Sequence, residues 1–318
     1  MIEALAPISK NSPEVYNRIL EIAIEIPLLT IDIRSELQFL FDQLLPEDKL
    51  RVIRPHIEKF LGKELFFFRT PLAELILIHG NKKDLEILIH SLNTEPWNLG
   101  DIWLKNIERS KQIFEKLSNP LAKLLYEIDI SGGWDEYKKK LENDTKKAEQ
   151  DLLLFLDNGR ISVCYTYLTS GEVLRKTALK HWKRIFLSDE ISKEVRNMYL
   201  GDLFDSENDE IVEYVAGEID RIHQDIKEEE KGEERMHRTS YYSYQLRPFD
   251  KIRDRCGYEG FKKLLLKVKD PYAIEGVMTY LVGAAKKEGV PKSEIQSMKE
   301  YDKLGKETKW NIIKNYDE

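Results

Sequence analysis

The sequence predicts an all-α protein with the form of a right-handed α-α superhelix and a smaller helical C-terminal part. Apolar residues recur at helical spacing along most of the 318 residues, whereas the alternating runs typical of strands are scarce. Local stop signals such as "HGN" at 79–81, "SNP" at 118–120 and "DNG" at 157–159 divide the chain into helices of ordinary length. An internal repeat, described below, predicts how these helices are arranged.

Composition places the chain among globular proteins. A hydrophobic fraction of 42% can bury a substantial core, and the net charge of −7 argues against binding polyanions over the whole surface. Cys164 and Cys256 form no Cys-x-x-Cys pair, so we expect reduced thiols in a cytoplasmic protein. The N-terminus lacks signal-peptide features, and no apolar run approaches the roughly 20 residues of a bilayer span. We therefore expect a soluble protein with no membrane association.

In chain order, the first ambiguous element is "EIAIEIPLLTIDI" at 21–33, which alternates as a strand would. Pro27 interrupts it, however, and helical patterns flank it on both sides. We predict a helix that ends near Pro27 and another that begins beyond Thr30. Further along, "AELILIHGNKKDLEILIHSL" at 73–92 contains two apolar helical stripes separated by a tight polar turn, which predicts a helix pair.

This helix pair recurs later in the chain without a gap, where Arg69 falls on Arg196 and the turn residue Asn81 on Asn208. In residue numbering this shift is 196 − 69 = 127, and we call it the repeat offset. The aligned apolar residues are Leu72 with Tyr199, Ile76 with Leu203, Leu77 with Phe204, Leu85 with Val212, Leu88 with Val215, Ile89 with Ala216 and Leu92 with Ile219. A second, shorter shift aligns the second helix of the pair with apolar residues between 121 and 128. A period of about 40–47 residues is expected of HEAT and armadillo arrays, and the repeat offset is about three such steps.

The stretch "EVRNMYLGDLFDSENDEIVEYVAGEI" at 194–219 and residues 69–92 resemble HEAT repeats. In such repeats two helices joined by a short polar turn share one apolar seam, and the resemblance extends over 69–92 and 172–222. It implies that helix pairs stack, because one pair cannot bury its stripe alone, and that one row of helices lines a concave inner surface. The alternative is an irregular helical bundle whose hairpins coincide by chance.

The balance of charge reverses late in the chain. Residues 205–234 hold 13 acidic and 3 basic residues, whereas 235–269 hold 10 basic and 3 acidic ones. We therefore predict a repeat array over 1–225, a charged linker or helix extension over 226–240 and a C-terminal helical region over 241–318.

The first candidate binding site is the helix "EVLRKTALKHWKRIF" at 172–186. Its apolar stripe consists of Leu174, Ala178, Trp182 and Ile185. The candidate binding residues on or near the opposite side are Arg175, Lys176, Lys180, Lys183 and Arg184. On the inner face these cations would suit phosphate, nucleic acid or an acidic peptide. Alternatively they pair with Glu210, Glu213 and Asp220 of the next inner helix, or stay solvated.

The second candidate is a basic and aromatic segment. Its binding residues are Tyr241, Tyr242, Tyr244, Arg247 and Phe249, followed by Lys251, Arg253 and Arg255. Aromatics interleaved with cations can stack on bases or anchor a protein interface. Alternatively the aromatics pack the C-terminal helices onto the end of the array.

The sequence contains few features that would indicate a metal site or a catalytic site. No pair among the six histidines has the spacing of a helical metal site, and no nucleophile elbow, P-loop or dinucleotide fingerprint occurs. The His-Glu dipeptide that di-iron hydroxylases built on HEAT repeats use as ligands is also missing. We therefore expect no metal and no cofactor, and we favour a protein that is not an enzyme.

The leading functional expectation is an interaction scaffold that binds a protein partner on the concave face of the array. The alternative is a nucleic-acid-binding protein similar to the alkylpurine DNA glycosylases, which use a positively charged concave face with Trp, Asp and Arg. The catalytic residues of that family cannot be matched here position by position. Continuous positive charge on the inner face would favour nucleic acid, whereas mixed charge would favour a protein partner. The oligomeric state stays open.

Overall fold

The computed structural model describes residue 18 and residues 46–62, 66–189, 191–229 and 238–317. Of residues 46–48, 66–68, 225–229, 238–248 and 317, only the backbone is described. Helices joined by short connections make up this part of the chain, and no strand occurs in it, which confirms the all-α prediction. The two helices predicted around Pro27 lie outside the described residues.

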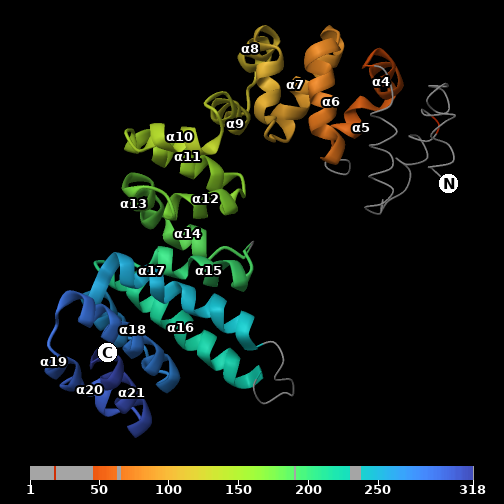
Figure 1. Ribbon diagram of the computed structural model, residues 1–318. Coiled ribbons are helices and arrows are strands. Elements are labelled where there is room, and N and C mark those ends of the chain that lie inside the picture. Colours follow the sequence, from red (N-terminus) through yellow and green to blue (C-terminus); the bar gives the residue numbers. More distant parts are fainter. Residues whose placement is uncertain (1–17, 19–45, 63–65, 190, 230–237, 318) are drawn as a thin grey trace. The chain divides into compact units, whose positions relative to one another are not determined.

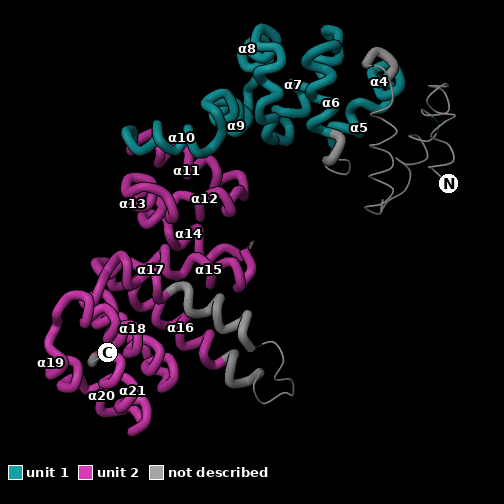
Figure 2. Tube along the Cα trace, viewed as in Figure 1, with its two compact units in different colours: residues 1–144 teal, residues 145–318 magenta. Residues whose placement is uncertain are grey.

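The chain divides into two compact units, residues 1–144 and 145–318 (Figure 2). The segment predicted as a charged linker or helix extension, 226–240, falls inside the second unit. The helix α17 (Arg238–Leu265) begins within this segment and packs against α15 (Lys193–Leu203) and α16 (Asp209–Glu229). The C-terminal helices therefore share a unit with the second copy of the predicted repeat. Residues 230–237 themselves lie outside the described residues.

Unit 1 is built from short helices that follow one another closely in sequence (Figure 1). Its described elements are α4 (Pro46–Ile53), η1 (Arg54–His56), α5 (Ile57–Phe60), α6 (Phe66–His79), α7 (Lys82–Thr94), η3 (Gly100–Lys105), α8 (Ile107–Lys116), α9 (Pro120–Ile130) and α10 (Trp134–Leu141). Most of the buried side chains from α4 to α9 form one apolar cluster, which includes the fully buried Ile53, Leu72, Ile76 and Leu88.

Unit 2 begins with helices of similar length, continues with three longer ones and ends in short helices. Besides α15, α16 and α17, it contains α11 (Thr145–Asp157), α12 (Ile161–Leu168), α13 (Glu172–Lys180), α14 (Trp182–Phe186), α18 (Pro271–Glu288), α19 (Lys292–Gln296), α20 (Lys299–Asp302) and α21 (Lys306–Asp317). The α17 helix is interrupted at Gly257, whose φ of 56° is accessible to glycine at little cost. It also packs against α18, which in turn contacts α21.

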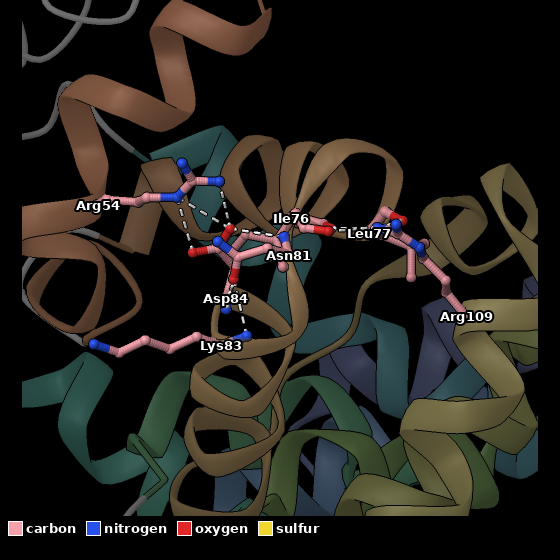
Figure 3. Close-up of polar contacts among 8 residues, drawn as sticks. Arg54, Ile76, Leu77, Asn81, Lys83, Asp84 and Arg109 are labelled. Atoms are coloured by element: carbon pink, nitrogen blue, oxygen red, sulfur yellow. Dashed lines mark hydrogen bonds and ion pairs between the residues drawn. The ribbon is translucent and has the colours of Figure 1, made fainter.

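The turn between α6 and α7 forms as the sequence predicts. Asn81 caps α7: its Oδ1 accepts hydrogen bonds from the backbone N–H groups of Lys83 and Asp84 at 2.9 and 3.0 Å. Asp84 completes a capping box by accepting from the N–H of Asn81 at 2.9 Å (Figure 3). Gly80 precedes this cap, and a Cβ there would lie 2.4 Å from the carbonyl oxygen of Ile76. Only glycine therefore fits this position without a rearrangement.

The helix pair α15–α16 repeats the asparagine cap at the repeat offset. The Oδ1 of Asn208 accepts from the N–H of Ile211 at 3.2 Å, which matches the bond between Asn81 and Asp84. Arg69 and Arg196 also correspond, because each donates from Nε to a carbonyl of the preceding segment, Gly62 at 3.0 Å and Ile191 at 3.2 Å. On the seam, Leu88 and Val215 are both fully buried. Both predicted helix pairs are thus present, whereas their stacking into a right-handed superhelix stays a prediction.

A buried carboxylate fastens η3 to α9. Oδ2 of Asp129 accepts hydrogen bonds from the N–H groups of Leu99 and Gly100, at 3.1 and 2.8 Å, and from Nε1 of Trp103 at 3.2 Å. Asp129 is 8% exposed, and its burial raises the pKa of the carboxyl above the ordinary value. This connection therefore depends on one titratable side chain.

Candidate interaction surface

The helix predicted over 172–186 is present but divided. His181, with φ −111° and ψ 16°, leaves the helical conformation and separates α13 from α14. The predicted apolar stripe is nevertheless buried on both sides of this break: Leu174, Ala178 and Ile185 are inaccessible and Trp182 is 7% exposed. Trp182 packs against Tyr214 with ring centroids 5.1 Å apart, so it belongs to the core.

The four cations opposite this stripe are exposed, and each lies beside a carboxylate. The ion pairs are Lys176 with Glu172 at 2.6 Å, Lys180 with Glu149 at 3.5 Å, Lys183 with Glu210 at 2.8 Å and Arg184 with Asp157 at 2.8 Å. The surface formed by these eight side chains, which we call the α13–α14 surface, therefore carries mixed charge. Of the three partners considered in the sequence, only Glu210 forms such a pair with these cations.

Local electrostatics agree with this pairing. Nε2 of His181 lies 3.1 Å from Oε1 of Glu149, and this hydrogen bond is the main cause that lowers the pKa of the Glu149 carboxyl. The hydrogen bond from Lys176 likewise lowers the pKa of Glu172. Both carboxylates thus hold their charge at neutral pH, when their ion pairs form. Exposed pairs of this kind add little to stability, so their main effect is on the charge pattern of the surface.

A shallow hollow of about 320 Å³ opens on the α13–α14 surface. Its lining residues are Leu156, Ile161, Lys183, Arg184, Leu187 and Ser188. Leu187 is 51% exposed there, which places an aliphatic side chain between charged ones. A hollow with an apolar contact and a charged rim resembles the anatomy of a protein–protein interface.

Arg175 lies apart from the four cations. Its Nη2 donates to the carbonyl oxygen of Phe204 at 2.7 Å, at the C-terminal end of α15. Burial lowers the pKa of its guanidinium, and the charge of Arg255 acts in the same direction. Arg255 donates to the carbonyl of Asp202 at 3.0 Å, and Lys263 to that of Ser206 at 2.6 Å. These cations thus satisfy carbonyls at a helix end, which is a structural role.

The side chains of the basic and aromatic segment are described only from Phe249 onward. Phe249 is 2% exposed and packs against Phe261 and Tyr280, as expected if the aromatics join the C-terminal helices. The side chains of Tyr241, Tyr242, Tyr244 and Arg247 lie outside the described residues.

Asp202 is a residue that the sequence interpretation missed. Its side chain is 1% exposed and pairs with Lys251 and, at 3.1 Å, with Arg255. A signal for it was present in the repeat offset, which aligns Asp202 with the buried apolar Leu75. A carboxylate where the matching helix has an aliphatic side chain requires a partner. The sequence interpretation also missed Glu149 and Asp157, which come from α11, two helices before α13, and precede Lys180 and Arg184 by 31 and 27 residues.

Few other features point to chemistry. The described residues contain no cluster of three His, Cys, Asp or Glu side chains that could hold a metal ion. Cys164 is buried, which raises the pKa of its thiol to about 12 and keeps it protonated. Among the described helices, none combines the length and apolar character needed to cross a bilayer.

Comparison with known proteins adds no assignment: no protein-family profile matches the chain, and neither a curated protein nor a solved structure matches it significantly. The HEAT resemblance therefore rests on the repeated helix pair and its caps.

Proposed function

We propose that this protein is an interaction scaffold, a HEAT-like helical array whose α13–α14 surface binds a protein partner. One observation carries the proposal: each of the four exposed cations there, Lys176, Lys180, Lys183 and Arg184, lies beside a carboxylate. Such a surface offers a partner both signs of charge around an exposed Leu187. Interfaces between proteins use this combination of a small apolar centre and a charged rim that sets orientation and association rate.

The same observation disfavours nucleic acid at this surface. A phosphate backbone would compete with Glu149, Asp157, Glu172 and Glu210 for the cations and would be repelled by these carboxylates. The net release of counterions, which drives binding to polyanions, would be correspondingly small. The resemblance to the alkylpurine DNA glycosylases gains no support either, because Trp182 is buried and Arg175 donates to a backbone carbonyl.

The test compares two triple variants of equal charge. In the first, Lys176, Lys180 and Lys183 are changed to Gln. In the matched control, three exposed lysines of the same unit, Lys267, Lys286 and Lys287, are changed to Gln. Each protein is titrated with random-sequence DNA and RNA at two salt concentrations, and is cross-linked in an extract of its source cells so that the cross-linked residues can be mapped by mass spectrometry.

The proposal predicts no salt-dependent nucleic-acid binding by the unmodified protein at about 50 mM salt. It also predicts cross-links from Lys176, Lys180 and Lys183 of the unmodified protein to one recurrent protein. The affinity for that partner, measured with purified proteins and without cross-linking, should fall in the first variant and persist in the control. Nucleic-acid binding that weakens steeply with salt and is lost only in the first variant would instead establish the nucleic-acid alternative.

A further inference from the structure

A second hollow, of about 460 Å³, lies in unit 1 between the segment 54–59 and the start of α7. We call it the Arg54 hollow. It is separate from the proposed interaction surface, and its volume falls in the range of small-molecule sites. Its chemistry is set by Arg54, His56, Lys59 and Lys83, together with two carboxylates, Asp84 and Glu58.

Arg54 is held in place by a buried carboxylate. Its Nε lies 3.2 Å from both oxygens of Asp84 and its Nη2 lies 2.9 Å from Oδ2, while Asp84 is 3% exposed (Figure 3). The hydrogen bond that Arg54 donates to Asp84 raises the pKa of Arg54, so the guanidinium is permanently charged. Its remaining nitrogen, Nη1, makes no hydrogen bond within the described residues. The pair thus fixes a cation and leaves one donor nitrogen available.

Three further polar side chains of the Arg54 hollow, those of His56, Lys59 and Lys83, lack such partners among the described residues. Nε2 of His56 is buried and has no hydrogen-bond partner among the described residues. Lys59 and Lys83 are exposed, and neither forms an ion pair with any residue that the structure describes. Because Arg54 neutralises Asp84, only the carboxylate of Glu58 opposes these cations. The hollow on the α13–α14 surface differs, since both of its cations are paired.

The backbone N–H groups at the start of α7 are not available to bind a ligand in the Arg54 hollow. The N–H groups of Asn81, Lys83 and Asp84 already donate within the capping box. A ligand would therefore be recognised by side chains, which come from two segments about 30 residues apart in sequence.

We propose that the Arg54 hollow binds the phosphate group of a small phosphorylated molecule. A phosphomonoester carries close to two negative charges near neutral pH and three acceptor oxygens, which suits donors that approach from Arg54, His56 and the two lysines. A carboxylate has one charge and two oxygens, so it would leave part of this set unsatisfied. The residues Ile57 and Ile87 add apolar contacts for the remainder of the ligand.

The test uses the full chain and three probes at constant ionic strength: inorganic phosphate, O-phosphoserine and glutamate. The binding of each probe is measured by titration calorimetry and by the chemical shifts of the protein's backbone amides. The variant removes two charges from the hollow, Lys59→Gln with Lys83→Gln. The matched control removes two charges from exposed lysines of the same unit that do not line it, Lys82→Gln with Lys111→Gln. All four side chains are exposed, so both proteins should fold.

We expect phosphate and phosphoserine to bind and glutamate to bind at least tenfold more weakly. Removing a partly exposed cation weakens a charge pair by a factor of about 3. The hollow variant should therefore lose about tenfold in affinity for phosphate, and the control less than twofold. Equal binding of glutamate, or an equal loss in both variants, would overturn the proposal. The same holds if neither phosphate probe shifts the amides of residues 54–59 and 81–87.

Discussion

The buried seam of the two repeated helix pairs makes a quantitative prediction about stability. Leu88 in α7 and Val215 in α16 occupy positions related by the repeat offset, and both side chains are fully buried. If the pairs are equivalent, truncating either residue to Ala should destabilise its unit by an amount set by the deleted groups alone.

The magnitude follows from the size of the deletion. Leu→Ala removes three methyl or methylene groups and Val→Ala removes two, and each is worth about 0.8 kcal/mol of transfer free energy. Transfer alone gives about 2.4 kcal/mol for Leu88→Ala and about 1.6 kcal/mol for Val215→Ala. A cavity that does not collapse adds about 2 kcal/mol in the first case and about 1.3 kcal/mol in the second. The expected losses in the free energy of unfolding are therefore about 2.4–4.4 and 1.6–2.9 kcal/mol.

Urea denaturation followed by circular dichroism measures these losses as shifts of the midpoint at constant slope. Exposed residues of the same helices, Glu86→Ala and Glu213→Ala, are the matched controls and should change the free energy of unfolding by no more than about 0.5 kcal/mol. A midpoint unmoved by Leu88→Ala or by Val215→Ala would refute the shared seam. So would a loss at Val215 much larger than that at Leu88.

Three further predictions concern single contacts. Because burial raises the folded-state pKa of Asp129 above its ordinary value of 3.8, its contribution to stability is complete below that pH and is lost as the pH rises through the folded-state pKa. Asp129→Asn should therefore gain stability relative to the unmodified protein between pH 4 and pH 8, and a pH-independent difference in denaturation midpoints would contradict this. Asn81→Ala should cost about 1.5 kcal/mol and Asn208→Ala about 1 kcal/mol, because the first cap accepts two backbone hydrogen bonds and the second accepts one, and thermal unfolding checks the order. Gly289 has a φ of 72° at the end of α18, so Gly289→Ala should lower the free energy of unfolding by about 1 kcal/mol. Gly283→Ala, inside the same helix, should raise it by about 0.5 kcal/mol. An increase for both variants would show that the left-handed cap is not required.

Local sequence determined the helices and their buried faces. Helical periodicity and stop signals gave the all-α class, and the stripe from Leu174 to Ile185 is buried as predicted. The repeat offset aligned the turn residue Asn81 with Asn208, and in the structure both residues cap the helix that follows. These features depend on residues within one or two helical turns, which is why a single sequence is enough to predict them.

Glu210 apart, the side-chain partners from other helices were decided only by the tertiary structure. Lys180 and Arg184 pair with α11, which precedes them by 31 and 27 residues, and Arg175 donates to a carbonyl 29 residues later. The mismatches in the repeat nevertheless contained a clue: the repeat offset aligns the buried carboxylates Asp84 and Asp202 with aliphatic residues. A buried charge must be neutralised wherever it occurs, so the sequence indicates that Asp84 and Asp202 need a cationic partner. Which cation reaches each carboxylate depends on how the helices pack, across sequence intervals that periodicity does not encode.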